Sequence, residues 1–228
     1  MRIRTACITT MSVLALIALA SCTSADAKTE EQSYEVTEQV KSLVVDAQAA
    51  AVTVEVGDGP VTVTESYHFS NDRPRTSHQV SGTDLRLTDS GCARDESRCA
   101  VEFEVRVPAS TAVSITTRAG AVKLTDLEGD VTINTDAGAI EGIGLGGEKV
   151  SVTTEAGATS LQFTEPPTAV TATTEVGAIS VKVPGGTAYA VEASTGAGGS
   201  DIGVQQDPAS PHKISLKTSV GAIRVENA

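Results

Sequence analysis

The chain has 228 residues and a formal net charge of −12 at pH 7, with 29 acidic residues against 17 Lys and Arg. This balance argues against a nucleic-acid partner and against attachment to anionic lipid by charge alone. With no Trp, three Tyr and three Phe, the chain also has little with which to build the aromatic platforms of carbohydrate sites.

Residues 1–21 are predicted to be a lipoprotein signal peptide. Two Arg precede an apolar stretch, Met11 to Ala20, that is too short to span a bilayer. The stretch ends in LASC, which resembles the bacterial lipobox, and that resemblance implies cleavage before Cys22 and a diacylglycerol on its thiol. The alternative is an ordinary secretory signal cleaved nearby, with Cys22 incidental.

A lipidated Cys22 makes the bilayer itself the first partner, because two or more acyl chains hold a protein stably at a membrane. The expected location is therefore the outer face of the bacterial cell membrane. Residues 22–39 are polar with few aliphatic side chains, and they are predicted to be a flexible tether. Residues 40–228 are predicted to form one elongated all-β domain. A split at Pro108, between a strand-rich cap and the repeats, is the alternative.

The N-terminal part of this domain shows strand patterns. Residues 43–54 match the later repeats if Ala50 takes the position of their glycine, which predicts a degenerate first copy. Residues 52–63, with the turn sequence GDGP, predict a β-hairpin. Residues 70–82 are polar and predict a loop, whereas 85–87 and 101–107 predict strands.

Cys92 and Cys99 are predicted to form a disulfide, because an exported protein meets an oxidising compartment. A metal-binding pair is the alternative, but no His or second cysteine pair lies close in the sequence. The three histidines, His68, His78 and His212, are scattered without metal-type spacing. No metal site and no cofactor are expected.

A repeated phrase organises residues 111–226, the predicted repeat core. Six glycines recur 18 to 23 residues apart, and a Thr stands three residues before each. The glycines are Gly120, Gly138, Gly157, Gly177, Gly198 and Gly221, and the threonines are Thr117, Thr135, Thr154, Thr174, Thr195 and Thr218. A period near 20 residues is typical of a solenoid, in which each repeat forms one rung.

Apolar residues seven, five and one before each glycine share their phase with the Thr, which predicts a strand with these four positions on one face. Beyond the glycine the apolar phase slips by one residue. We therefore expect each rung to be a strand, a glycine corner that takes positive φ, a second strand and a turn. The predicted fold is an all-β, single-stranded β-solenoid with rungs of about 20 residues.

The Thr row is expected to face inward and to pass hydrogen bonds from rung to rung. An outward row would instead suit a flat polymer or ice surface. Two residues before the glycine, Asp136, Glu155 and Glu175 form an acidic row at about strand spacing. A cation such as Ca²⁺ is one hypothesis for this row, and a solvated face is the simpler one. The glycine-rich run 142–147 lacks a following helix and is not predicted to bind a nucleotide.

The lipobox, the VRVPA sequence ending at Ala109 and the repeated T-x-x-A/V-G-A-I phrase are together similar to the DUF4097 family of bacterial envelope proteins. The resemblance covers roughly residues 40–228. It implies a β-helix-like or "toastrack" fold and an adhesin-like role in binding or scaffolding. It implies no catalytic residues and no enzyme activity, and in some members a role in sensing envelope stress.

The preferred hypothesis is a non-catalytic surface lipoprotein whose solenoid faces contact a protein or glycan of the envelope or of another surface. A sensor or regulatory module is the alternative, and an enzyme acting on polysaccharide is the least favoured. The last repeat runs to Val225 with no cap beyond it, so we expect that end to be where a second molecule docks.

Overall fold

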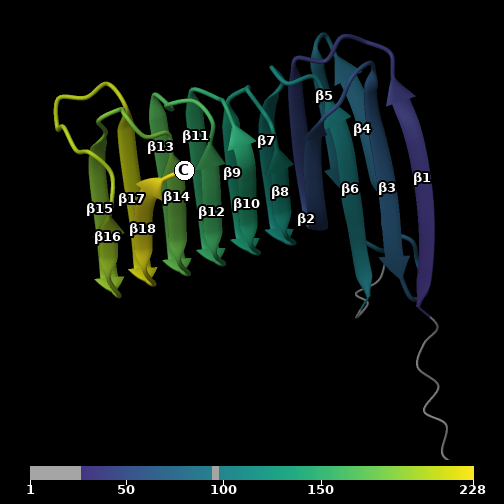
Figure 1. Ribbon diagram of the computed structural model, residues 1–228. Helices are drawn as coiled ribbons and strands as arrows, with labels where there is room; N and C mark the ends of the chain where they lie inside the picture. The colour runs from purple at the N-terminus through teal and green to yellow at the C-terminus, as the bar shows by residue number, and fades with distance from the viewer. Residues whose placement is uncertain (1–26, 94–97) are drawn as a thin grey trace, which may run out of the picture.

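The computed structural model describes residues 27–93 and 98–228, which form 18 strands. The predictions for the signal peptide and for Cys22 concern residues outside these ranges. No helix in the described part of the chain is long and apolar enough to cross a membrane. The strands lie side by side in two sheets, in a row that runs along the molecule (Figure 1).

Sheet B is parallel except for its first pair. Its order is β4 (Thr76–Ser81), β5 (Asp84–Asp89), β2 (Ser42–Val56), β7 (Ala112–Ala119), β9 (Val131–Ala137), β11 (Lys149–Ala156), β13 (Ala169–Val176), β17 (Lys213–Val220) and β15 (Ala190–Ala197).

Sheet A begins with two antiparallel pairs and is parallel thereafter. Its order is β1 (Lys28–Val36), β3 (Val61–Phe69), β6 (Cys99–Val107), β2, β8 (Val122–Thr125), β10 (Ile140–Leu145), β12 (Thr159–Phe163), β14 (Ile179–Val183), β18 (Ile223–Asn227) and β16 (Ser200–Ile202). Strand β2 contributes its first half to sheet B and its second half to sheet A.

Each rung places one strand in each sheet, and the inward side chains of both sheets form one core. Val150 and Val152 of β11 and Leu161 and Phe163 of β12 are all nearly fully buried. The apolar cluster continues without interruption from Val36 to Val225. The predicted all-β solenoid is therefore confirmed. The alternation works because successive side chains of a strand point to opposite faces, and Val and Thr suit such surfaces.

The glycine corners explain why the repeats need glycine. A Cβ built on Gly157 would lie 1.9 Å from the carbonyl oxygen of Gly138, and one on Gly138 would lie 1.9 Å from that of Gly120. The corner N–H of Gly138 donates to the carbonyl of Ala156 in the next rung, at 2.9 Å. Close approach of stacked backbones, more than the positive φ we predicted, thus reserves the position for glycine.

One predicted position faces the wrong way. The residue directly before each glycine was expected inside, yet these side chains are exposed, with Val176 56% and Val220 51% accessible. The phase slips before the glycine, because two consecutive residues point outward where the strand leaves its sheet. An apolar residue at this position therefore lies on the outside of the corner.

The last two repeats are exchanged in space. Strand β17 pairs with β13 on one side and β15 on the other, and β18 lies between β14 and β16. The sixth repeat is therefore inserted between the fourth and the fifth. Our expectation that the rung ending at Val225 forms the open end is wrong, because the rung of β15 and β16, here called the terminal rung, lies outside it.

Three further predictions for the N-terminal part need correction. Residues 28–36, inside the predicted tether, form β1, which pairs with β3 along its whole length; its side chains are polar because it is an edge strand. Residues 52–63 form no hairpin, since β6 lies between β2 and β3 and Val105 pairs with both Val54 and Val63. The predicted loop 70–82 contains β4, which forms a hairpin with β5.

The degenerate first copy is confirmed. Ala49 pairs with Ala119 and Val52 with Val122, so Ala50 occupies the glycine position of its rung. Instead of a glycine corner, β2 bends beside Asp89, a carboxylate that is only 5% exposed. Its Oδ2 accepts the N–H groups of Gln48 and Ala49, each at 3.3 Å, and its Oδ1 accepts that of Gly91 at 2.8 Å.

Candidate functional site

The polar side chains that gather most closely line a pocket in the N-terminal cap, which we define as β1 and β3–β6 with their connections. The pocket has a volume of about 520 Å³. It is bounded by β1, by the end of the segment between β3 and β4, and by β4. Its lining residues are Gln32, Glu65, Arg73, Pro74, Arg75, Thr76, Ser77 and His78.

Glu65 is the centre of this site. Strand β3 alternates strictly, so Glu65 points to the same inward face as Val63 and Tyr67 and is only 2% exposed. A carboxylate in such a position costs several kcal/mol unless hydrogen bonds replace its hydration, a cost of roughly this order for any buried charge. The surrounding strands must therefore supply donors.

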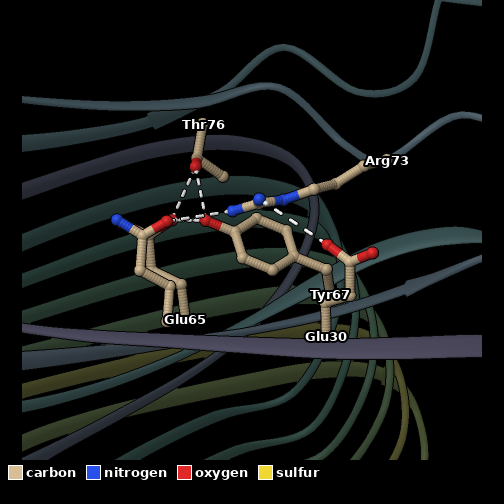
Figure 2. A network of polar contacts seen from close by, with 6 residues as sticks. Glu30, Glu65, Tyr67, Arg73 and Thr76 are labelled. Atoms are coloured by element: carbon tan, nitrogen blue, oxygen red, sulfur yellow. Dashed lines mark hydrogen bonds and ion pairs between the residues drawn. The ribbon is translucent and has the colours of Figure 1, made fainter.

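Three hydroxyl groups supply them. Tyr34 of β1 donates to Oε1 of Glu65 at 2.7 Å. Figure 2 shows the other two, of which Thr76 of β4 donates to Oε2 at 2.5 Å. Tyr67, two residues along β3, donates to the same Oε2. The carboxylate thus joins three strands of the cap, and hydrogen bonds to a charged group are the stronger kind.

The two phenols are held in their protonated form. Burial raises the pKa of Tyr34 above its ordinary value near 10, and its hydrogen bond to Glu65 raises that pKa further. Burial likewise raises the pKa of Tyr67, with the bond to Glu65 as the next cause. Both side chains therefore remain donors to the carboxylate at neutral pH.

Two side chains cover the rings of these tyrosines. The guanidinium of Arg73 lies 3.7 Å from the centre of the Tyr67 ring, a cation–π contact. Figure 2 shows it reaching toward Glu30, with 3.7 Å between Nη1 and Oε2. It also donates to Oε1 of Gln32 at 3.1 Å. His78 stacks on Tyr34 with 4.3 Å between ring centres.

This arrangement is suited to binding or to fixing the cap, and it is poorly suited to hydrolysis of glycosides. Such enzymes use two carboxyl groups about 5–9.5 Å apart across the reacting bond. Glu65 is the one carboxylate among the lining residues, and its oxygens are occupied by three hydroxyls. Among the described residues, no group of three His, Cys, Asp or Glu side chains could hold a metal ion.

Most of the residues singled out from the sequence lie away from this pocket. Cys92 and Cys99 form the expected disulfide. His68 contacts Glu102 on the outer side of sheet A, His78 lies at the pocket and His212 contacts Pro167. The acidic row of Asp136, Glu155 and Glu175 is solvent-exposed on the flank of sheet B. The glycine-rich run 142–147 belongs to β10 and the turn after it.

The Thr row faces inward, but it forms no ladder of hydroxyls. Thr218 donates to the carbonyl of Gly177 at 3.1 Å, and Thr195 to that of Gly221 at 2.9 Å, in each case across to the next rung. Thr117 donates to the carbonyl of Ala119 at 3.2 Å. The hydroxyls of Thr135, Thr154 and Thr174 have no hydrogen-bond partner within the described residues. The expected ladder of hydroxyl-to-hydroxyl bonds is therefore wrong, because the hydroxyls that are paired donate to backbone carbonyls and the other three have no partner.

Sequence reasoning missed the network around Glu65. A signal was present, because Val61, Val63, Glu65, Tyr67 and Phe69 alternate with polar residues, which places a charged residue in an inward phase. What the alternation could not show is that Tyr34, which we assigned to a tether, would meet Glu65 from β1.

Comparison with known proteins matches residues 47–226 to the family model described as Toastrack DUF4097. The chain is similar to the structure of a "putative cell adhesion protein" from Clostridium sporogenes, with a TM-score of 0.55, 14% identity and coverage of 89% of this chain and 100% of that one. It is similar to a "putative adhesin" from Bacteroides fragilis, with a TM-score of 0.40, 14% identity and coverage of 88% and 97%. No curated protein matches it.

Proposed function

The chain belongs to the Toastrack DUF4097 family, and we propose that it is a non-catalytic lipoprotein whose solenoid presents an adhesive or scaffolding surface in the bacterial envelope. The description of the Clostridium sporogenes structure as a "putative cell adhesion protein" agrees with this proposal. The observation that carries it is the outer face of sheet B, where a regular array of short polar side chains lies open to solvent.

That array follows from the register. In adjacent rungs Thr116 stands beside Asn134, Asn134 beside Thr153, and Thr153 beside Thr173. A second row on the same face contains Ser114, Thr132, Ser151, Thr171 and Ser215. Strand spacing of about 4.8 Å makes the face repetitive along the stack. Repetitive, extended surfaces of this kind suit extended partners that are held by many weak contacts.

A retention assay tests the binding role. The full chain, fluorescently labelled, is incubated with the envelope fraction of its own host and sedimented. We expect Asn134→Lys combined with Thr153→Lys to lower the bound fraction several-fold, because the long charged side chains interrupt the polar face. The matched control is Thr154→Val, which changes the buried neighbour of Thr153 and should leave binding unchanged. Equal retention of all three proteins would refute a role for this face.

We further propose that a lipid on Cys22 anchors the protein to the outer face of the cell membrane. The support is the lipobox in the sequence LASC and the position of β1, which begins six residues after Cys22. Metabolic labelling with a fatty-acid analogue should mark the wild-type chain and fail to mark Cys22→Ser. Equal labelling of both chains would contradict the anchor while leaving the binding role intact.

A further inference from the structure

The end of the solenoid farthest from the N-terminal cap, which we call the distal end, consists of the terminal rung. In Figure 1, β15 and β16 are the last strands of the row, at the opposite end from β1. Strand β15 pairs only with β17, and β16 only with β18, among the strands that the structure describes. Both sheets therefore end here in an unpaired edge.

The free backbone groups of this edge can be identified. Ala190 donates its N–H to His212, on the side of β17. Because alternate residues direct their backbone groups to opposite edges, Val191, Ala193 and Thr195 direct theirs outward. Tyr189 also faces outward, but its N–H and C=O are bonded to Gln205 and Asp207 of the following loop. The open stretch begins after this bridge and ends at the Gly198 corner.

The core is also incompletely covered at this end. Val191 and Ala193 are only partly buried. Their partners in β17, Ile214 and Leu216, are each 1% exposed. Ile202 of β16 is partly buried as well, whereas Val225 beside it is 0% exposed. Inward apolar positions left open in both sheets indicate a surface that a further rung would cover.

Beyond the bridge from Tyr189 to the following loop, β15 carries none of the usual obstacles to such an addition. Natural edge strands carry Lys, Pro or bulges that prevent pairing with another chain. Strand β15 reads AVEASTGA, with Glu192 as its one charged residue and no Pro or Lys. At the other end of sheet A, β1 reads KTEEQSYEV and carries four charged side chains along its nine residues. The edge strand β1 is therefore protected by charge against pairing with another chain, whereas β15 is not.

We propose that the distal end is a docking surface for the distal end of a second copy of this chain, with β15 pairing antiparallel to β15 of the other copy. The reason to choose a second copy is geometric. One rung holds two edges, β15 in sheet B and β16 in sheet A, at a fixed separation. A single extended peptide covers one edge, whereas an identical solenoid end matches both at once. The N-terminal end does not match them, because sheet A extends three strands beyond β2 and sheet B only two.

The contact is isologous and closes after two copies, which is the commonest symmetry of protein dimers. Antiparallel pairing centred on Ala193 places Glu192 opposite Ser194 of the other copy, so no like charges meet on β15. If the anchor at Cys22 is correct, the distal end points away from the membrane, and the contact would join proteins on two facing surfaces. This last step rests on the proposed function, whereas the dimer itself does not.

Cross-linking tests the contact in the full chain. Ser194→Cys places a thiol on the outer face of β15, and a short bis-maleimide should join two copies into a dimer on a denaturing gel. The matched control is Thr153→Cys, in the same exposed row three rungs away, with the wild-type chain to report any reaction of Cys22. A dimer band specific to Ser194→Cys supports the proposal. Equal bands in all three proteins, or none, would overturn it.

An edge-blocking variant provides the second test. Ala193→Pro removes an outward N–H and adds a ring at the edge, without touching a bond to β17, as proline is tolerated on the free side of an edge strand. In sedimentation velocity of the full chain in mild detergent, the wild-type should sediment faster as concentration rises, and Ala193→Pro should remain at the monomer value with an unchanged circular dichroism spectrum. Concentration-independent sedimentation of the wild-type chain would refute the dimer.

Vesicle aggregation separates this inference from the proposed function. Phosphatidylcholine vesicles that carry the lipidated chain should aggregate, and those that carry Ala193→Pro should not. If the chain dimerises but the vesicles stay dispersed, the distal contact stands and adhesion between surfaces fails. If the vesicles aggregate equally with both chains, adhesion stands and the distal contact is not its cause.

Discussion

The repeat core and the N-terminal cap belong to the same two sheets, but different atoms hold their strands together. In the core, the corner of each rung contacts the next chiefly through backbone atoms, as where Gly157 donates its N–H to Val176 and packs against the carbonyl of Gly138. In the cap, side chains bond to one another: Glu65 collects the hydroxyls of Tyr34, Tyr67 and Thr76.

The difference shows what repetition supplies. Within the stack, every rung finds the N–H and C=O groups of an identical neighbour, so the sequence needs only a glycine, inward apolar residues and short outward ones. Where the stack stops, those neighbours are missing and buried donors must be satisfied in another way. Asp89 takes this part at the bend of β2, where its carboxylate accepts three backbone N–H groups.

The largest effect is expected at a corner. Gly157→Ala places a methyl 1.9 Å from the Gly138 carbonyl oxygen, at a φ of +155°. The oxygen belongs to the backbone of the next rung and cannot move away without breaking rung-to-rung bonds. We expect a loss of about 3–5 kcal/mol in the free energy of unfolding, from overpacking and unfavourable φ together. Urea denaturation measures it.

Gly186→Ala is the control for this corner. Gly186 also has positive φ, +85°, but a Cβ there would meet nothing within 4 Å. Gly186→Ala should lower the free energy of unfolding by only about 1 kcal/mol, the cost of the backbone conformation alone. Equal losses for both variants would show that φ, and not the stacking of the corners, reserves these positions for glycine.

A smaller loss of stability is expected in the cap, where a side chain supplies the hydrogen bonds that a neighbouring rung would otherwise make. Asp89→Ala leaves the N–H groups of Gln48, Ala49 and Gly91 without their acceptor, and we expect the free energy of unfolding to fall by about 2–4 kcal/mol. Asp136 is an exposed carboxylate in the repeat core, and Asp136→Ala should change the free energy of unfolding by less than about 0.5 kcal/mol. Similar values for the two variants in urea denaturation would remove the distinction between cap and core.

Repetition also decided what could be predicted. The offsets around Gly120 and its equivalents predicted the strands, the corners and the pairing of Ala50 with that position, because six copies report on one local geometry. They did not predict that the sixth repeat lies between the fourth and the fifth. Each repeat carries the same inward pattern, so β15 and β17 fit the edge of β13 equally well by pattern.

The cap was less predictable, because each of its strands occurs once. The polar sequence of β1 is typical of a tether as well as of an edge strand, and composition does not separate the two. The alternation of β3 indicated that Glu65 points inward. Two of its partners, Tyr34 of β1 and Thr76 of β4, lie in segments that the sequence pattern predicted to be a tether and a loop. Contacts between strands that occur once depend on their order in the sheet, and the repeat pattern does not predict that order.

The hydroxyls around Glu65 should make the cap sensitive to alkali. Because the pKa of Tyr34 is raised in the folded state, chiefly by burial, the stability linked to this proton is complete below the unfolded pKa near 10 and declines as pH rises above it. Tyr34→Phe should cost about 1.5–3 kcal/mol at pH 7, the usual value of a hydrogen bond to a charged group. Above pH 10 its free energy of unfolding should fall less steeply than that of the wild-type chain. Parallel pH profiles in urea denaturation would contradict the role of Tyr34.

The smallest effects, and the finest comparison, lie within the Thr row of the core. Thr154 has no hydrogen-bond partner for its buried hydroxyl, whereas Thr218, at the same position of another rung, donates to Gly177 at 3.1 Å. Replacing a buried, unpaired hydroxyl by a methyl removes its desolvation cost, so Thr154→Val should leave the free energy of unfolding unchanged or raise it by up to about 1 kcal/mol. Thr218→Val should lower it by about 0.5–1.5 kcal/mol, because a hydrogen bond is lost. If both variants lose the same amount in urea denaturation, the hydroxyl of Thr154 is satisfied after all, and a buried water in the core is the natural partner.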